Sequence, residues 1–166
     1  LMDNAVDLIV TCDTEVAGLT GVQFVPLATQ SPCVFFPPGH RYERMRYVEP
    51  VDLEGEIIIS AYNSAVSMMP SKTANTLMAS GIMGKATRYF PDGDTAFLAV
   101  RIGLGIFIAS HLCDDFATRH HVKSVDLKAD LPLVTLGVAW KQDDKRIETF
   151  AKAAKGVLAR RMKQES

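Results

Sequence analysis

The segment PDGDTAFLAVRIGLGIFIAS, residues 91–110, constrains the fold of this chain more than any other stretch. Its apolar positions follow helical spacing behind a turn, which predicts a helix capped by the side-chain oxygen of Asp94 or Thr95. Gly103 stands where a helix end favours left-handed backbone, and Gly105 lets the following strand pass close to a neighbouring element. The segment therefore predicts one turn–helix–strand unit, and the capped helix start is a candidate wall of a ligand site.

Apolar and alternating runs elsewhere predict an α/β protein with mainly parallel sheets. A helix is predicted for residues 67–80, a polar helical connector for 111–119, and a helix with one apolar stripe for 146–161. Short strands are predicted at residues 7–11, 22–27, 31–38, 56–60, 86–90, 122–127 and 133–140.

Two extended crossings, near residues 25–32 and 121–127, bracket one middle block of the sequence. This pattern predicts two lobes, because the chain would leave the first lobe, build the second and return. The first lobe would contain residues 1–30 and 121–166, and the second would contain residues 31–120. Ligands of such folds bind between the lobes, at loops after strands and at helix starts.

The composition, with 48% hydrophobic and 22% charged residues, is that of an ordinary globular domain. Its net charge of −1 provides no basic field, so this chain itself is not expected to bind nucleic acid. The longest apolar runs fall well short of the ~18 residues that a membrane-spanning helix needs. Residues 1–10 contain two Asp and no basic residue, so no signal peptide is expected.

The three cysteines, Cys12, Cys33 and Cys113, are widely spaced and form no C-x-x-C motif. An odd number at such spacing predicts free thiols rather than a disulfide framework or a zinc site. Cys12-Asp13 and the histidine pair at 120–121 could supply a thiol and a base, but no spacing supports catalysis. Adjacent histidines rarely face one ligand together. We therefore expect no catalytic residue, no metal and no cofactor.

Four stretches resemble the effector-binding domain of LysR-type transcriptional regulators in their order and spacing. They are DLIV at residues 7–10, PPGHRY at 37–42, T-x-x-x-x-V-x-x-G-L-G-I at 95–106 and LGVAWK at 136–141. The resemblance covers nearly the whole chain. Ala109 departs from the family pattern, which usually has a proline after this glycine-containing strand.

The resemblance implies a two-lobed, periplasmic-binding-protein-like α/β fold of type 2 that binds a small-molecule effector in the cleft between its lobes. It implies that the first lobe lacks its first βαβ unit in this sequence. DNA binding would belong to an N-terminal winged helix-turn-helix domain that is also absent from this sequence. The parent protein would be a cytoplasmic bacterial regulator, a homodimer or homotetramer without membrane contact.

The resemblance also places the effector-binding residues in three loops that line the cleft. Their hydroxyl, amide and backbone N–H groups can bind a small polar ligand without a fixed cation. The alternative is that the serine, aspartate and threonine side chains at 64, 94 and 95 only form caps and turns. The acids at 13, 92 and 94 would repel an anion, which favours a neutral, amine-bearing or aromatic effector. The residues are Thr11, Cys12 and Asp13 in the first loop, Ser60, Tyr62, Asn63 and Ser64 in the second, and Asp92, Asp94 and Thr95 in the third.

Two other functions share this architecture. A solute-binding protein of a transporter has the same two lobes, but free cysteines and the absent signal segment count against it. A small enzyme would need a pair of titratable groups with shifted pKa values in the cleft, and the sequence offers no convincing pair. The leading hypothesis is therefore a ligand-sensing domain without catalysis of its own.

Overall fold

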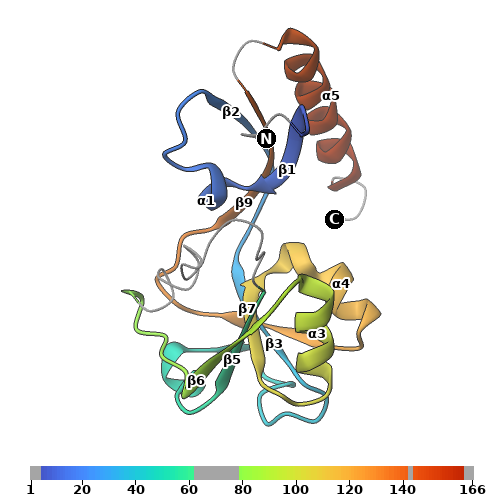
Figure 1. Ribbon diagram of the computed structural model, residues 1–166. Helices are drawn as coiled ribbons and strands as arrows, with labels where there is room; N and C mark the ends of the chain where they lie inside the picture. The colour runs from blue at the N-terminus through green and yellow to red at the C-terminus, as the bar shows by residue number, and fades with distance from the viewer. Residues whose placement is uncertain (1–4, 62–78, 142–143, 163–166) are drawn as a thin grey trace. The chain divides into compact units, whose positions relative to one another are not determined.

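The computed structural model describes residues 5–61, 79–141 and 144–162, and the chain forms two compact units (Figure 1). Unit 1 contains the chain up to Thr29 and from Val134 onward, and unit 2 contains Gln30–Leu133. Among the described helices, none combines the length and apolarity that crossing a membrane requires.

Unit 1 is built on a three-stranded sheet in the order β1-β9-β2. β9 (Val134–Lys141) lies in the middle and pairs antiparallel with β1 (Leu8–Cys12). Gly137 of β9 is buried, and a side chain would have no room there, because a Cβ atom would lie 2.3 Å from Cζ of Phe24 on β2 (Val22–Gln30). The short helix α1 (Asp13–Val16) follows β1 directly.

The helix α5 (Lys145–Met162) completes the described part of unit 1 (Figure 1). Ile147 and Ala151 of α5 are buried and pack in one core with Val138 and Trp140 of β9. The predicted helix is confirmed, but its apolar stripe is only partly buried, since the Phe150 side chain is 54% exposed.

Unit 2 contains a six-stranded mixed sheet in the order β4-β8-β3-β7-β5-β6. Parallel pairs join β4 to β8 and join β5 to both β6 and β7, whereas β3 runs antiparallel to β7 and β8. The strands are β3 (Pro32–Phe36), β4 (Tyr47–Val48), β5 (Ile57–Ala61), β6 (Ala86–Phe90), β7 (Ile106–Ser110) and β8 (Lys123–Leu127).

The prediction of mainly parallel sheets is wrong for the middle of this sheet and for the pair of β1 with β9 in unit 1. Parallel neighbours need a crossover connection, usually a helix, to bring the chain back to the same end. β3 is the first strand of this sheet along the chain, so no crossover from another strand of the sheet precedes it, and β2, which ends at Gln30, belongs to the sheet of unit 1. β3 pairs with β7 and β8 and runs antiparallel to both.

The chain also returns to unit 1 later than the predicted crossing at residue 121. β8 pairs with β3, with Val125 opposite Val34, and the buried side chains of Val125 and Leu127 pack in the core of unit 2. The alternating pattern of residues 122–127 thus reflects burial against this sheet, and unit 1 resumes only at Val134.

The two faces of β3 supply two cores, because successive side chains of a strand point to opposite faces. Val34 and Phe36 belong to a core that includes Leu53 of the short 3-10 helix Pro50–Leu53. Cys33 and Phe35 belong to the other core, which includes residues of α3 (Gly93–Arg101) and α4 (Asp114–Arg119). A second 3-10 helix, His111–Cys113, connects β7 to α4.

The predicted turn–helix–strand unit of residues 91–110 is confirmed as α3 followed by β7. Gly103 adopts left-handed backbone with φ = +79° and ends the helix. A Cβ atom at Gly105 would lie 2.3 Å from the backbone oxygen of Ile57, so β7 passes close to the start of β5 as predicted. The helix predicted for residues 67–80 lies almost entirely outside the described residues.

Candidate functional site

One edge of the sheet in unit 2 gathers several of the predicted effector residues. Because β5, β6 and β7 are mutually parallel, their carboxyl ends lie at the same edge. Ser60 of β5 lies opposite Tyr89 of β6 there, and α3 begins just after β6. The carboxyl edge of such a sheet is the usual place for a ligand. The structure thus places Ser60 and the first turn of α3 at one edge.

The cap of α3 is Asp92, and the prediction that Asp94 or Thr95 caps this helix is wrong. Asp92 has extended backbone, which directs its side chain at the helix start, and its Oδ1 atom accepts the backbone N–H of Thr95 at 2.8 Å. The Thr95 hydroxyl donates to the same oxygen. These hydrogen bonds, first from the hydroxyl and then from the backbone, lower the pKa of Asp92. Both donors of Thr95 are therefore used within the turn.

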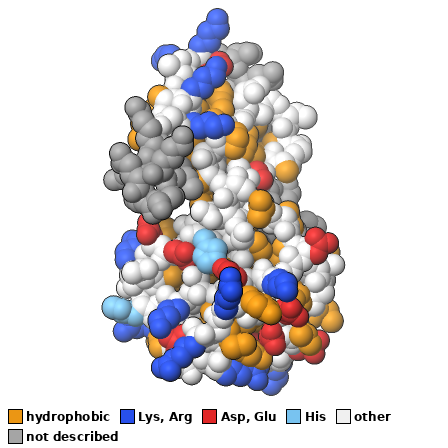
Figure 2. Space-filling model, turned by 180° about the vertical axis from the view of Figure 1, so that it is seen from behind, with side chains coloured by type: hydrophobic (Ala, Val, Ile, Leu, Met, Phe, Trp, Pro, Cys, Tyr) orange, Lys and Arg blue, Asp and Glu red, His pale blue; other side chains and the backbone are white. Residues whose placement is uncertain are grey.

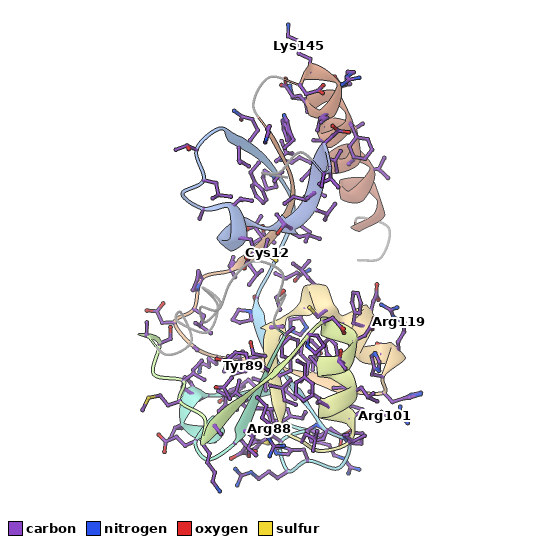
Figure 3. The ribbon with its side chains drawn as sticks, in the orientation of Figure 1. Cys12, Arg88, Tyr89, Arg101, Arg119 and Lys145 are labelled. Carbon is purple, nitrogen blue, oxygen red and sulfur yellow. The ribbon has the colours of Figure 1, made fainter. Side chains whose placement is uncertain are left out.

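The next acid, Asp94, pairs with a histidine rather than with the helix backbone. Its Oδ1 atom lies 3.2 Å from Nε2 of His120, and the His120 ring stacks against Phe97 of the same helix. Arg101 lies at the other end of α3 (Figure 3) and donates from Nη1 to the backbone oxygen of His120 at 3.1 Å. His120 is thus held against α3, and the hypothetical thiol–base pair with Cys12 gains no support.

The first predicted loop lies in unit 1, where β1 ends and α1 begins (Figure 3). Thr11, Cys12 and Asp13 are half-buried, and Oδ1 of Asp13 accepts the backbone N–H of Thr135 at 3.3 Å. Burial first, and then the charges of Asp13 and Glu15, raise the pKa of the Cys12 thiol. The thiol is therefore protonated at neutral pH, which makes it a poor nucleophile.

Tyr62, Asn63 and Ser64 of the second predicted loop lie outside the described residues. Effector contact stays a prediction for the other candidates, because the structure describes each half of the proposed site within its own unit. These candidates are Thr11, Cys12, Asp13, Ser60, Asp94 and Thr95.

Charged side chains of both signs are interspersed on the face that Figure 2 shows.

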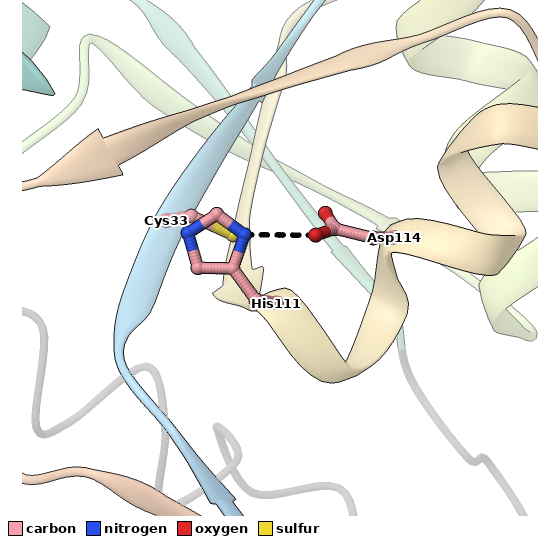
Figure 4. A group of neighbouring side chains, drawn as sticks. All are labelled: Cys33, His111 and Asp114. Carbon is pink, nitrogen blue, oxygen red and sulfur yellow. Dashed lines mark hydrogen bonds and ion pairs between the residues drawn. The ribbon is translucent and has the colours of Figure 1, made fainter. Parts of the chain in front are cut away.

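A cluster that the sequence analysis missed lies where β7 ends. His111 follows β7 directly, and its Nδ1 atom lies 2.9 Å from Oδ2 of Asp114 (Figure 4). Its Nε2 atom lies 2.9 Å from Oδ1 of Asp126. Burial lowers the pKa of His111, but the hydrogen bonds and charges of the two carboxylates outweigh it and raise the pKa on balance. The fully buried Cys33 lies beside them, and burial raises the pKa of its thiol strongly.

Only part of this cluster leaves a trace in the sequence. His111 and Asp114 are three residues apart at the start of a helical segment, a spacing that brings side chains together. Cys33 and Asp126 lie on β3 and β8, which are far apart in the sequence but adjacent in the sheet. Pairing of β3 with both β7 and β8 brings them beside His111.

Comparison with known proteins identifies the family. A family model described as the LysR substrate-binding domain matches residues 1–159. The chain belongs to this family. The resemblance seen in the sequence is thereby confirmed, and the family favours a regulatory ligand-binding domain over the solute-binding protein of a transporter. A comparison with curated protein sequences finds no match.

Solved structures with the same fold include LysR regulatory domains. The CcmR regulatory domain from Synechocystis PCC6803, in complex with 2-PG, has 15% identity and a TM-score of 0.73, over 95% of this chain and 76% of that one. The QuiR effector-binding domain, in complex with shikimate, has 16% identity and a TM-score of 0.68, over 99% and 75%. The MetR regulatory domain from N. meningitidis has 17% identity and a TM-score of 0.63, over 95% and 71%.

This LysR domain therefore has the predicted periplasmic-binding-protein-like fold of type 2. It covers 71% of the MetR structure but 50% of the Corynebacterium glutamicum OxyR chain, with which it shares 17% identity at a TM-score of 0.70. Identity at this level establishes the fold alone.

Proposed function

We propose that this domain senses a small organic effector and transmits its presence to a helix-turn-helix domain of the same regulator. The observation that carries the proposal is the carboxyl edge of β5, β6 and β7, where Ser60 lies beside the capped start of α3. The second half of the site is the end of β1, with Thr11 and Asp13. Closure of the two halves around the effector would change the arrangement of the regulator on DNA.

The chemistry of these two halves favours a neutral, amine-bearing or aromatic effector. The half-buried Asp13 in unit 1 and the exposed Asp94 in unit 2 add negative charge to the proposed site, which disfavours an anion. Solved relatives bind benzoate in BenM and shikimate in QuiR, and both of these ligands are carboxylates. A carboxylate is therefore the competing class, and the experiment includes both.

The regulator acts, in this proposal, in the bacterial cytoplasm as a homodimer or homotetramer, and the domain itself catalyses no reaction. The protonated thiol of Cys12 supports the last point, because catalysis by that residue would need a thiolate. Reading the coding sequence upstream of Leu1 tests the regulatory role. A winged helix-turn-helix supports the proposal, and a secretion signal contradicts it.

Effector binding is tested by calorimetry and thermal shift with two panels, aromatic amines or neutral aromatics and small carboxylates. For a ligand that binds, we expect Ser60→Ala and Thr11→Val to weaken affinity about three- to tenfold each, the usual effect of one neutral hydrogen bond. Thr87→Val is the matched control, because Thr87 is an exposed threonine on β6 opposite Ile58, away from the edge.

Three results would count against the proposal. If neither Ser60→Ala nor Thr11→Val changed the affinity, the effector would not bind at the proposed site. An equal loss in Thr87→Val would show a general effect on folding. Binding confined to carboxylates would keep the site and overturn the effector class.

A further inference from the structure

Three potential metal ligands converge in unit 2 from three different elements (Figure 4). Cys33 comes from β3, His111 from the 3-10 helix after β7, and Asp114 from the first residue of α4. Their Sγ, ring nitrogen and carboxylate oxygen atoms all lie within 4.8 Å of one another. Sulfur, nitrogen and oxygen donors in one set are typical of Zn²⁺ and related divalent cations.

A second observation is the carboxylate of Asp114, whose two oxygens are used unequally. Oδ2 pairs with His111, whereas Oδ1 is shielded from solvent and has no hydrogen-bond partner among the described residues. A shielded carboxylate oxygen without a partner is costly, and an ion is one of its ordinary explanations.

A third observation is the position of Asp126 on the other side of the histidine ring. Its Oδ1 atom lies 2.9 Å from Nε2 of His111, so the ring is held between two carboxylates. Histidines that bind a metal through one nitrogen commonly donate the other N–H to a carboxylate, which fixes the ring orientation. Asp126 is placed to orient His111 in this way while Nδ1 faces Asp114.

A protonated His111 between two carboxylates explains part of this arrangement without a metal. It accounts for the two 2.9 Å contacts of the ring. It does not account for Oδ1 of Asp114, which has no hydrogen-bond partner among the described residues. A cation bound by Asp114 together with His111 and Cys33 accounts for it.

We propose that Cys33, His111 and Asp114 bind a divalent cation of the Zn²⁺ class, with Asp126 as a positioning residue. Metal–ligand distances of about 2.0–2.3 Å in tetrahedral geometry place ligand atoms roughly 3.3–3.8 Å apart. The cluster therefore contracts around the ion, and the direct contact between Asp114 and His111 opens by less than 1 Å. The three protein ligands leave a fourth position for water or an anionic ligand.

This proposal goes beyond effector sensing and does not depend on it. All four residues belong to unit 2, so the site needs no contact with unit 1. Burial keeps the free Cys33 thiol protonated, and a bound cation reverses that preference because a coordinating thiol loses its proton.

The test titrates Co²⁺ and Zn²⁺ into the 166-residue chain after removal of metal with a chelator. We expect one equivalent of Co²⁺ to produce tetrahedral d–d bands and a sulfur-to-cobalt charge-transfer band. X-ray absorption of the zinc form should show one sulfur ligand at about 2.3 Å. Asp114→Asn should abolish the one-equivalent binding or weaken it at least tenfold, and Asp126→Asn should weaken it about 10- to 100-fold.

Matched controls separate the cluster from one other thiol and one other acid of the chain. Cys12→Ser removes a thiol in unit 1, and Asp94→Asn removes an acid that also pairs with a histidine. Both should bind Co²⁺ with unchanged affinity and spectrum, whereas Cys33→Ser should lose the charge-transfer band. Circular dichroism checks that each variant is folded. If Cys33→Ser does not fold, Asp114→Asn still tests the site, because Asp114 is half-exposed and its substitution disturbs the core less.

Several outcomes overturn the proposal. They are the absence of one-equivalent binding, zinc with no sulfur ligand, an unchanged spectrum in Asp114→Asn, or loss of the charge-transfer band in Cys12→Ser.

Discussion

Replacement of Gly105 by alanine tests the close approach that positions β7. The added Cβ atom would lie 2.3 Å from the backbone oxygen of Ile57, whereas real Cβ atoms essentially never come within 3.0 Å of a neighbour. The two strands must therefore separate by at least 0.7 Å at this point. A ladder hydrogen bond of about 2.9 Å would lengthen to about 3.6 Å, beyond the range of a real bond. The neighbouring pair of Ile58 with Ile106 is the first to be affected.

The expected cost is about 3 kcal/mol, which combines one weakened ladder hydrogen bond with strain from overpacking. Gly103→Ala is the internal comparison, because Gly103 has φ = +79° and open space around its Cβ position. Its cost is backbone strain alone, about 1 kcal/mol. With a urea m-value of about 2 kcal/mol/M, the two variants should lower the midpoint by about 1.5 M and 0.5 M.

The assay is urea unfolding followed by circular dichroism, with amide hydrogen exchange to locate the change. Amides of β5 and β7 should exchange faster in Gly105→Ala. Trp140, the only tryptophan, lies in β9 and reports on unit 1 by fluorescence. A midpoint shift in Gly105→Ala that is no larger than that in Gly103→Ala would refute the reasoning, because close approach would then cost no more than backbone strain.

Two further predictions concern hydrogen-bonded carboxylates. Asp92→Ala should speed amide exchange at Thr95 and lower the urea midpoint, because it removes the acceptor that caps the helix. Asp92→Asn keeps an acceptor, so its exchange rate and midpoint should lie between those of the wild type and the alanine variant. Exchange at the wild-type rate in Asp92→Ala would contradict the cap. The guanidinium and backbone N–H of Arg146 lower the pKa of Asp144 to about 2. The ionised Asp144 carboxylate therefore contributes its full stabilisation above the ordinary Asp pKa of about 3.9, and this stabilisation is lost as the pH falls through 2. A carboxyl NMR titration should give this midpoint and show an upward shift in Arg146→Ala, and an unshifted midpoint in that variant would contradict the assignment.

Local chemistry made the helix and strand of residues 91–110 predictable. The helix is predictable because its apolar spacing and its end at Gly103 agree. The close approach at Gly105 is predictable because glycine has no side chain to prevent it. The cap is hard to assign from the sequence because three oxygen-bearing residues, Asp92, Asp94 and Thr95, lie within four positions and compete for it. Only the backbone angles of Asp92 show which of them faces the helix start.

Strand direction and the lobe boundary depend on tertiary pairing that local patterns do not encode. An alternating strand such as β8 has the same sequence pattern whichever sheet it joins, and its partner β3 decides that it belongs to unit 2. The candidate effector residues were inferred from their loops in the family, because hydroxyl and amide side chains show no spacing of their own.

The proposed metal site illustrates how a sheet can create a site that no motif announces. Zinc motifs in sequences depend on ligands that are close together in the chain. Here β3 supplies Cys33 opposite Ala109 of β7, and two residues later the chain reaches His111. β3 also pairs Cys33 with Asp126 of β8, so one central antiparallel strand brings together groups from both of its neighbours. The strand whose direction the sequence did not predict is thus the strand that assembles the cluster. A central strand that pairs antiparallel on both sides can thus bring together groups that lie far apart in the sequence.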